Sequence, residues 1–439
     1  MVDAGGNTGH LSRRTALKRG AITVGCLLTA SRSAAAEPTE IDECTTIEGP
    51  GEYVLTDDLS ADGNCLTIRG ATLDGNGHTI SGNGTGKGIA INSEADIRDL
   101  HIRGFRAGIY DNHTGSGSDI SLKNSVVSDN SQGIALGRLS NLDMQDSIIR
   151  DNGGGIQDNE GSQINMTQCT LSGNDSSAIS TAYGNTVTMN NCTVTENGRG
   201  ILTGEGEFRD STIARNGGKG ITLTGYWFGG ARGSATIVGN EIRDNSGAGI
   251  DVIFSNADVR ENTISNNQDG VLLTSYSGFA SPPDEYVFYK NNIEDNDGFG
   301  IQHHGEQLVA VATCNYWGDP TGPQHDDNPS ENPQGDKVSD NIIFTPWSVT
   351  RIQDGEGTCI GGKDLEPISD FENPPTDPDG DWRFEDVNGD GEVNIKDVED
   401  LFANRFDSTI QESPESFDFN GDGDFDIVDI QALYVESIQ

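Results

Sequence analysis

Two twelve-residue segments near the C-terminus carry oxygen-bearing side chains at the spacing of a calcium loop. Carboxylates or side-chain amides stand at loop positions 1, 3, 5, 9 and 12, a backbone carbonyl is available at position 7, and glycine at position 6 permits a sharp turn. The candidate ligands are Asp386, Asn388, Asp390, Glu392, Asn394 and Asp397 in the first segment, and Asp418, Asn420, Asp422, Asp424, Asp426 and Asp429 in the second. Because a hard divalent cation prefers such oxygens, the spacing predicts one Ca²⁺ ion in each segment.

Each loop runs into an amphipathic stretch, around Leu401 and Leu433, whereas Pro- and Asp-rich residues precede it. A helix is therefore expected after each loop and not before it, so the pair is not a regular EF-hand. The two units lie 32 residues apart and resemble a type I dockerin, which implies a small α-helical, calcium-dependent module that docks onto a cohesin. The chain departs from cellulosomal dockerins at loop positions 10 and 11, where Ile395–Lys396 and Ile427–Val428 replace small hydroxyl residues. This departure leaves a cohesin-like partner open.

Two insertions in the middle of the chain gather aromatic residues suited to contact with sugar rings. They span residues 224–235 and 274–286, in a chain with only 6% aromatic residues. We expect them to wall one cleft that binds polysaccharide, since loops beside a regular scaffold commonly carry function. The alternative is that the rings only cover the outer face of a sheet. The candidate ligand-binding residues are Tyr226, Trp227, Phe228, Arg232, Tyr276, Phe279, Asp284, Glu285 and His303.

No catalytic signature is present, so the catalytic residues stay unknown. The motif successions of pectic hydrolases and the Asp-Pro-His-Asp sequence of uronan epimerases are both absent. An enzyme of this kind would be a polysaccharide lyase, a glycoside hydrolase or an epimerase. The single grouping of histidines joins His303 and His304 with His325, and neighbouring strand residues point to opposite faces, so at most one of the first two faces outward.

Four basic residues recur one or two positions before the same glycine. They are Lys87, Arg106, Arg199 and Lys219. Two interpretations stay open: a basic stripe for acidic sugars, or solvated turn residues.

A repeated sequence motif, an Asn followed by a few small residues and then Gly-Ile, defines the scaffold that must position these side chains. The Ile or Val positions are 89, 109, 134, 156, 179, 201, 221, 250, 271 and 301. Most steps measure 20–25 residues, each repeat has two short β-prone runs, and none has an apolar stretch long enough for a helix. We expect a right-handed parallel β-helix of about ten coils, about 48 Å long at about 4.8 Å per strand. The Asn suits a left-handed turn and a stacked amide ladder, and the Gly supplies a sharp corner.

The opening and closing phrases of this region extend the interpretation. Gly51-Glu-Tyr-Val-Leu-Thr, Leu73-Asp-Gly-Asn-Gly-His-Thr-Ile and Cys314-Asn-Tyr-Trp-Gly are similar to the first and last coils of secreted right-handed β-helix proteins. That superfamily includes pectate lyases, polygalacturonases, uronan epimerases and the NosD-type metal-maturation family. The resemblance implies the fold and leaves three functions open: polysaccharide binding or processing, a non-catalytic structural or adhesion scaffold, and metal maturation.

The composition excludes one class of partner. The chain has 439 residues with 70 acidic and 27 basic ones, a net charge of −43. General nucleic-acid binding needs a basic face and is excluded on this ground. Because concentrated salt screens such repulsion, the acid excess predicts a halophilic source.

The N-terminus and the cysteines indicate export. Arg13-Arg14, the apolar run Ala21–Ala30 and Ala34-Ala-Ala36 resemble a twin-arginine signal peptide, with lipid anchoring at Cys26 as the alternative. Outside the signal the cysteines are even in number, which suits an oxidising exterior, and no other segment is apolar enough to span a membrane. We expect disulfides among Cys44, Cys65, Cys314 and Cys359, while Cys169 and Cys192 either form a bridge or are two small buried residues.

Five parts follow for this extracellular or cell-surface protein. They are a signal at 1–36, an N-terminal cap at 37–69, the β-helix at 70–350, an acidic Pro/Gly linker at 351–383 and the dockerin-like domain at 384–439.

Overall fold

The computed structural model describes most of the chain after the expected signal. The described residues are 37–113, 117–158, 161–181, 185–225, 233–274, 286–305, 309–330, 332–353, 359–360, 365–378, 383–411, 413–420 and 425–437. The predicted signal peptide and most of both aromatic insertions lie outside them.

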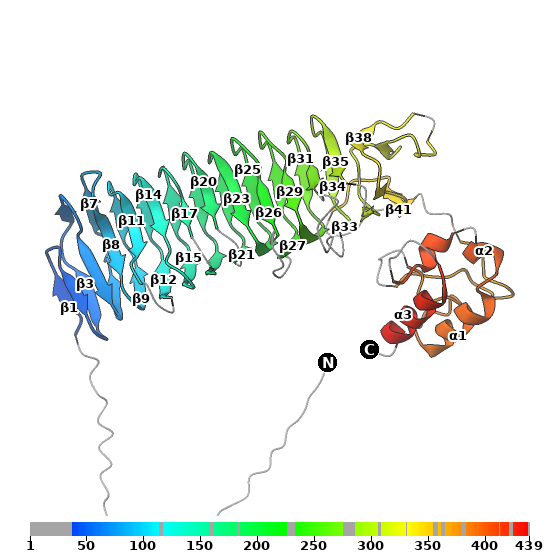
Figure 1. Cartoon of the computed structure of the whole chain (residues 1–439), viewed down its shortest axis with the longest axis horizontal. Helices are drawn as coiled ribbons and strands as arrows, with labels where there is room; N and C mark the ends of the chain where they lie inside the picture. Colours follow the sequence, from blue (N-terminus) through cyan, green and yellow to red (C-terminus); the bar gives the residue numbers. More distant parts are fainter. Residues whose placement is uncertain are drawn as a thin grey trace, which may run out of the picture. The chain divides into compact units, whose positions relative to one another are not determined.

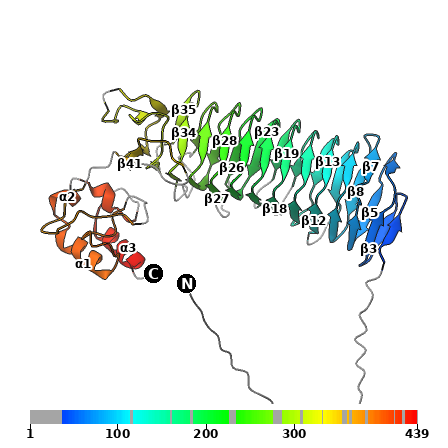
Figure 2. The same ribbon diagram turned by 180° about the vertical axis from the view of Figure 1, so that it is seen from behind.

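The chain winds into a parallel β-solenoid, seen from two sides in Figures 1 and 2. Each coil adds one strand to a first sheet, then one to a second and one to a third, which we call sheets A, C and B. The described residues form fourteen, eleven and fourteen strands in sheets A, C and B respectively. The segment 37–69, expected as a separate cap, contributes β1 to β5 to these same sheets.

The strands have the following bounds. Sheet A contains β1 (Thr39–Ile41), β3 (Glu52–Leu55), β6 (Ala71–Asp74), β9 (Ala95–Arg98), β12 (Asp119–Lys123), β15 (Asn141–Gln145), β18 (Gln163–Thr167), β21 (Thr186–Asn190), β24 (Glu205–Arg209), β27 (Gly233–Val238), β30 (Ser255–Arg260), β33 (Tyr286–Tyr289), β36 (Ala310–Val311) and β39 (Ile342–Ile343). Sheet C contains β4 (Leu59–Ala61), β7 (Thr79–Gly82), β10 (His101–Arg103), β13 (Val126–Ser128), β16 (Ile148–Arg150), β19 (Thr170–Ser172), β22 (Thr193–Thr195), β25 (Thr212–Ala214), β28 (Glu241–Arg243), β31 (Thr263–Ser265) and β34 (Asn292–Glu294). Sheet B contains β2 (Thr46–Glu48), β5 (Leu66–Arg69), β8 (Lys87–Ile91), β11 (Ala107–Asp111), β14 (Gln132–Ala135), β17 (Ile156–Gln157), β20 (Ser177–Ser180), β23 (Arg199–Thr203), β26 (Ile221–Thr224), β29 (Ile250–Ile253), β32 (Val271–Thr274), β35 (Phe299–His304), β38 (Gly335–Val338) and β37 (Pro323–Gln324). A small antiparallel pair joins β40 (Trp347–Ser348) to β41 (Cys359–Ile360).

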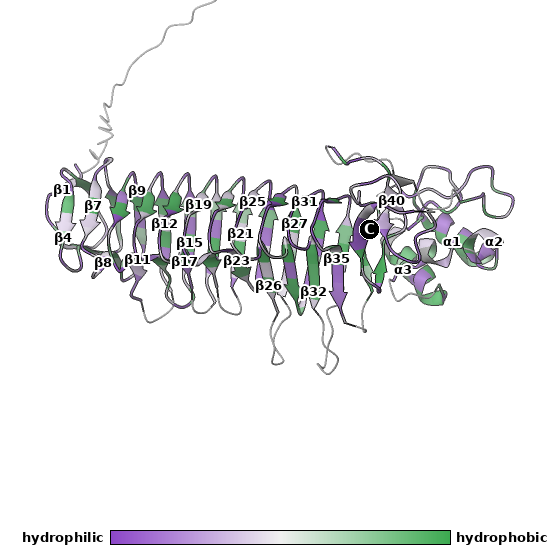
Figure 3. Cartoon of the chain, turned by 90° about the horizontal axis from the view of Figure 1, so that it is seen from above, coloured by the Kyte–Doolittle hydropathy of each residue, from purple (hydrophilic) through white to green (hydrophobic). Residues whose placement is uncertain are grey.

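The Ile and Val residues of the repeated motif form one continuous row inside the solenoid. Ile89 pairs in register with Ile109, which pairs with Ile134, and the row continues to Ile301. Inward apolar residues alternate with outward polar ones along each strand, which gives the banded hydropathy of Figure 3. Burial of this row on every coil supplies the core that the sequence pattern predicts.

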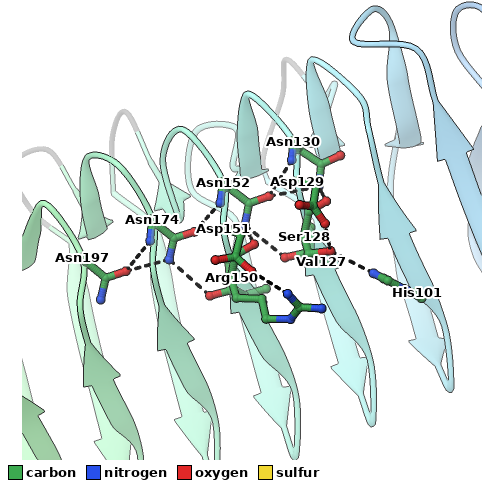
Figure 4. Close-up of polar contacts among 11 residues, drawn as sticks. His101, Val127, Ser128, Asp129, Asn130, Arg150, Asp151, Asn152, Asn174 and Asn197 are labelled. Carbon is green, nitrogen blue, oxygen red and sulfur yellow. Dashed lines mark hydrogen bonds and ion pairs between the residues drawn. The ribbon is translucent and has the colours of Figure 1, made fainter.

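The Asn residues of the motif form the predicted ladder (Figure 4). Asn152 is representative: its Oδ1 accepts the backbone N–H and the Nδ2–H of Asn130, both at 3.0 Å. Its Nδ2 donates to the carbonyls of Val127 at 3.0 Å and Arg150 at 2.9 Å. The members are Asn130, Asn152, Asn174, Asn197, Asn216, Asn245, Asn267 and Asn296. These amides satisfy backbone groups that the corner would otherwise leave buried without partners.

Two details of the corner differ from expectation. The left-handed residue is the one before the Asn, as in Asp151 at φ 54° and Glu196 at φ 59°, because the Asn itself must hold its side chain inward. The Gly before the Ile is needed for space and not for a positive φ. A Cβ at Gly200 would lie 2.0 Å from the carbonyl oxygen of Gly220 on the next coil.

A second ladder of mixed chemistry runs before the strands of sheet C. The ladder positions nearest the C-terminus hold Asn291, Asn262 and Asn240. Toward the N-terminus the equivalent positions hold Ser211, then Cys192 and Cys169, and then serines. Cys192 Sγ accepts the N–H of Cys169 at 3.4 Å, and both cysteines are buried free thiols. The open question about this pair is therefore settled by the structure in favour of small buried residues.

Disulfides occur at the ends of the solenoid. Cys44 and Cys65 form a bridge with an S–S distance of 2.02 Å. Cys314 is also disulfide-bonded, while the side chain of Cys359 lies outside the described part.

The C-terminal region has a separate hydrophobic core that includes Leu401, Phe417 and Leu433. Its helices are α1 (Ile395–Asn404), α2 (Ser408–Gln411), the 3₁₀ helix η1 (Pro414–Phe417) and α3 (Ile427–Ser437). Within the described residues, no helix combines the length and the apolar character needed to cross a membrane.

Candidate functional site

The first calcium loop is described at every predicted ligand. At position 1, Asp386 is buried; its Oδ1 accepts the N–H of Asp390 at 3.0 Å and its Oδ2 accepts that of Gly391 at 2.9 Å. Gly391 has φ 88°, a conformation that favours glycine, so the turn at position 6 has its expected cause. The loop therefore folds around the carboxylate that begins it.

Asp397, at position 12, closes the loop and starts helix α1. Its Oδ1 accepts the N–H of Asn388 at 3.4 Å, and its Oδ2 accepts that of Asn394 at 2.9 Å. Asn394 caps the helix in return by accepting the N–H of Lys396 at 2.9 Å. Burial raises the pKa of Asp397, and the charges of Asp386 and Asp390 raise it further. A bound cation would relieve this electrostatic repulsion.

The donor set fits calcium. Carboxylate and amide oxygens at the stated positions are the hard ligands that Ca²⁺ takes, and they would hold the ion and stabilise the loop around it. Within the described residues, no three His, Cys, Asp or Glu side chains converge into a metal cluster. The Asn388 and Asn394 amides and a backbone carbonyl belong to the predicted set alongside the acids.

The second loop repeats the arrangement where it is described. Asp429 Oδ1 accepts the N–H of Asn420 at 3.1 Å and its Oδ2 accepts that of Asp426 at 2.7 Å, as Asp397 does in the first loop. Burial, followed by a hydrogen bond and the charge of Asp418, raises the pKa of Asp429. The predicted ligands Asp422 and Asp424 lie outside the described residues.

The two loop–helix units also expose equivalent apolar residues. Ile395 and Ile427 at loop position 10 are 48% and 49% exposed, and Phe402 and Tyr434, 32 positions apart, are 48% and 46% exposed. Since large apolar side chains seldom stay exposed as a repeated set, these four residues are candidates for contact with a partner. We call them the docking face: Ile395, Phe402, Ile427 and Tyr434.

In the solenoid, the topology brings the two aromatic insertions to one edge of sheet B. The first follows β26 and the second follows β32, and both strands pair with β29 between them. Most of the predicted contacts lie outside the described residues: Tyr226, Trp227, Phe228, Arg232, Tyr276, Phe279, Asp284 and Glu285.

His303 lies inside the solenoid and not at a cleft edge. It pairs in register with the buried Leu273, is only 7% exposed, and its ring lies edge-on to that of Tyr286 at 5.8 Å. Burial lowers its pKa, and the neighbouring His304 lowers it further. His304 is the outward member of the pair, so it replaces His303 as the candidate for surface contacts.

Sequence reasoning missed Asp251, the outward residue on the β29 coil between the two insertions. It is 1% exposed, and its Oδ2 accepts from Lys219 Nζ at 2.5 Å. Its Oδ1 has no partner among the described residues, and burial raises its pKa despite the nearby ammonium of Lys219. In the sequence, Asp251 directly follows Gly249-Ile250, and Lys219 lies two positions before Ile221 on the preceding coil. An acid and a base at neighbouring coils were therefore the available signal.

The outer face of sheet B differs in charge from that of sheet A. In sheet B, the outward positions are the residue two before and the residue one after each buried Ile or Val. From β8 to β35 the charged residues at these positions are three bases, Lys87, Arg199 and Lys219, and two acids, Asp251 and Asp269. Between β6 and β30, the outward charged residues of sheet A are Asp74, Asp96, Asp119, Asp143, Glu205, Glu207 and Asp258 against Arg98, Lys123, Arg209 and Arg260. Sheet B therefore lacks the acid excess of the chain as a whole. We name its C-terminal half the sheet B strip: Arg199, Leu202, Lys219, Thr222, Asp251, Asp269, Leu272 and Gln302.

Comparison with known proteins agrees with both parts of the chain. A family model described as a right-handed β-helix region matches residues 58–229 and 207–317, and one described as a dockerin type I domain matches residues 384–434. None of the curated protein sequences matches significantly.

Three solved structures are similar. The A-module of the Azotobacter vinelandii mannuronan C-5 epimerase AlgE6 shares 18% identity, covers 71% of this chain and 92% of its own, and gives a TM-score of 0.40. The A-module of AlgE4 from the same organism shares 15% identity, with 71% and 80% covered and a TM-score of 0.32. A variant of the periplasmic alginate epimerase AlgG shares 11% identity, with 67% and 78% covered and a TM-score of 0.34.

Proposed function

The chain belongs to the right-handed β-helix family, and from this premise we propose that it binds polysaccharide outside the cell while its dockerin domain attaches it to a protein partner. The observation that carries the proposal is the sheet B strip. It combines half-buried Leu202 and Leu272 with polar groups that donate and accept hydrogen bonds, and it lacks the acid excess that would repel an acidic polymer. Such a mixture of apolar surface and a few polar groups is typical of ligand sites.

The aromatic insertions would supply stacking surfaces beside this strip. They begin after β26 and β32, two strand steps apart, or about 10 Å at about 4.8 Å per step. Trp227 and Tyr276 are our proposed stacking residues, with Arg232, Asp284 and Glu285 as polar contacts. Stacking and hydrogen bonding require no turnover, so the proposal is of binding.

Affinity electrophoresis of the full chain in gels that contain neutral or acidic polysaccharides tests the strip. We expect at least one polymer to retard the wild type, and Leu202→Ala with Leu272→Ala, or Trp227→Ala with Tyr276→Ala, to abolish the retardation. Val238→Ala on the outer face of sheet A is the matched control and should bind as the wild type does. If no polymer retards the wild type, the binding function is refuted and a scaffold role takes its place.

We propose that the docking face binds a cohesin-like protein with an apolar contact surface. Apolar Ile395 and Ile427 stand where small hydroxyl residues are common in cellulosomal dockerins, so the partner should bury them against apolar side chains. Binding to a cohesin panel should need Ca²⁺ and should be lost in Ile395→Asp with Ile427→Asp, while Val435→Asp, also exposed on α3, measures the effect of an acid beside the face. Equal binding by the double variant would refute this docking face.

We also propose that the protein is exported by the twin-arginine route into concentrated salt. The net charge of −43 destabilises the folded state most when screening is weak. The solenoid should melt at lower temperature in dilute salt than in about 2 M salt, where the screening length is only about 3 Å. Equal melting temperatures would remove the argument for a saline habitat.

A further inference from the structure

A cavity of about 470 Å³ lies at the C-terminal end of sheet B. It is open to solvent, residues 324–330 form one side of it, and the lining residues that matter here are Phe299, Gln324, His325, Asp326, Ser330 and Lys337. Its volume falls within the range of about 300–1,000 Å³ that small-molecule sites occupy. None of these lining residues belongs to the sheet B strip.

The cavity nevertheless continues the strip. Phe299 occupies the position two before Ile301, which is the position of Lys219 before Ile221 and of Asp269 before Val271. It pairs in register with Lys337 of β38, and its N–H donates to Asp269 Oδ1 at 3.0 Å. From β26 to β38 there are four strand steps, or about 19 Å at about 4.8 Å per step. A polymer that lies along the strip therefore reaches the cavity at one end.

The loop that lines the cavity is held by hydrogen bonds of Asn328. Asn328 is buried; its Nδ2 donates to the carbonyls of Thr321 at 3.0 Å and Pro323 at 2.7 Å, and its Oδ1 accepts the N–H of Ser330 at 2.8 Å. A wall fixed in this way loses little entropy when a ligand binds.

The imidazole of His325 is fixed as well. Its Nδ1 accepts the N–H of Asp327 at 3.0 Å, and its ring centroid lies 5.3 Å from that of Phe344. Its Nε2 lies 3.4 Å from Asp340 Oδ1. The ring is therefore a wall of the cavity with both nitrogens already placed, and it is not the group that recognises a ligand.

Two charged groups that line the cavity remain available. The structure gives neither Lys337 Nζ nor the Asp326 carboxylate an ion-pair or hydrogen-bond partner within the described residues. Gln324 Nε2 donates to the carbonyl of Gly335 at 2.9 Å, which orients the amide. One ammonium, one carboxylate and one aromatic ring thus line the same space, and the carboxylates of Asp327 and Asp340 beside His325 make its surroundings net acidic.

We propose that this cavity holds the terminal sugar unit of a neutral polysaccharide, an inference that rests on the polysaccharide binding proposed above. The ring of Phe299 would pack against the apolar face of the sugar, Asp326 would accept hydrogen bonds from hydroxyl groups, and Lys337 would donate to ring or hydroxyl oxygens. Because the described strands of sheet B end at β38 and β37 beside this cavity, the site takes a chain end and not the middle of a chain. The net acidic surroundings select an uncharged unit over a uronate.

Isothermal titration of the full chain with neutral and uronate-containing oligosaccharides tests the inference. We expect a neutral oligosaccharide to bind, and its Kd to rise about tenfold in Asp326→Asn and in Lys337→Met, since each removes a hydrogen bond to a charged group. Chemical modification of one terminus of the oligosaccharide should abolish binding. Asp119→Asn and Lys123→Met on sheet A are the matched controls and should leave the Kd unchanged.

The outcomes separate this inference from the proposal on which it rests. If polymers bind and the strip variants lose binding, but the Asp326 and Lys337 variants bind oligosaccharides as the wild type does, the cavity assignment is overturned and the strip is retained. Binding of uronate oligosaccharides alone would overturn the neutral specificity. If no polymer or oligosaccharide binds, both proposals fail. Unchanged melting temperatures of the variants exclude misfolding as the cause of any loss.

Discussion

The solenoid and the C-terminal domain both use side-chain oxygens to accept hydrogen bonds from backbone N–H groups, but the side chains differ. In the solenoid, Asn152 Oδ1 accepts a buried backbone N–H from Asn130 at 3.0 Å. In the dockerin domain, Asp397 Oδ2 accepts the N–H of Asn394 at 2.9 Å. The first acceptor is a neutral amide and the second is a carboxylate. This difference determines what else each region requires.

Neutral amide acceptors can stack on one another without electrostatic repulsion. The eight ladder Asn residues repeat along the coils at about 4.8 Å, and each Nδ2 donates to the next Oδ1, so the ladder needs no counterion. Carboxylates held close together repel one another: burial raises the pKa of Asp397, and the charges of Asp386 and Asp390 raise it further. We therefore expect the dockerin loops to need a cation, whereas the amide ladder carries no charge that would need one.

One residue joins the two chemistries. The Asn ladder ends at Asp336, whose Oδ2 accepts the N–H of Asn296 at 3.1 Å and its Nδ2–H at 2.8 Å. Burial raises the pKa of Asp336 to about 6, which is well above the usual range of aspartate. The solenoid thus carries a carboxylate in an amide position at its last step.

The largest expected effect is that of a charge within the ladder. Asn197→Asp would bury a carboxylate and remove the Nδ2 donor that reaches the carbonyls of Leu171 at 3.0 Å and Thr195 at 3.0 Å. We expect a loss of about 3–5 kcal/mol in unfolding free energy, as for a buried charge left without its partner. Urea unfolding at pH 7 measures it.

The matched control for this variant is Asn190→Asp, at an exposed position on the outer face of sheet A next to Arg209. It should change the unfolding free energy by less than about 1 kcal/mol. Equal losses in the two variants would show that the ladder does not depend on neutral acceptors.

Calcium removal should affect the two regions differently. Saturating Ca²⁺ stabilises a domain by about 3–4 kcal/mol when its concentration is 100 to 1,000 times the Kd. In scanning calorimetry of the full chain, replacing calcium with a chelator should therefore shift only the unfolding transition of the α-helical dockerin domain. Asp386→Asn with Asp397→Asn should reduce the shift, because it removes two carboxylate charges from the first loop while the second loop stays intact.

A control for ion-specific effects uses the solenoid transition in the same scans. It should stay constant at matched ionic strength. A shift of both transitions would mean that calcium acts on the solenoid too, and that the contrast between the regions is mistaken.

Asp336→Asn should make the end of the ladder uniform. The folded pKa of Asp336 is about 6 and an unfolded aspartate has a pKa of about 3.9, so the folded state holds the proton more tightly and stability falls as pH rises between these values. The ionised residue therefore destabilises the wild type by about 2–3 kcal/mol above pH 6. The variant should be more stable by that amount at pH 7 and nearly unchanged at pH 4. A gain that is equal at both pH values would refute the assignment.

The sequence contained most of the fold because the repeat is local. The positions from Ile89 to Ile301 stack in one row, and the parallel β-helix and the dockerin resemblance are confirmed. The sequence did not reveal Asp336 as the last step of the ladder, since it lies 40 residues after Asn296 and outside the repeated motif. A partner that distant cannot be inferred from periodicity.

The sites were less predictable for the same reason. Asp251 and His303 differ by a single position relative to the buried Ile or Val row: the first is one residue after it and faces outward, and the second is two residues after it and faces inward. A strand reverses its side-chain direction at each residue, so a site residue is located only when the register is known. The cavity at Lys337 depends on a loop that has no repeat pattern at all.

The smallest expected effect lies in the mixed ladder, where sulfur replaces oxygen. Cys169 accepts a hydrogen bond from the backbone of Ser147 and donates its own N–H to Cys192 Sγ. Cys169→Ser keeps an acceptor in place and should change the unfolding free energy by less than about 1 kcal/mol, whereas Cys169→Ala leaves the Ser147 N–H without a partner and should lose about 1–3 kcal/mol. Urea unfolding under reducing conditions compares the two variants. Equal losses would mean that the thiol acts only as a small apolar residue, and that the hydrogen-bonded ladder is interrupted where the two cysteines stand.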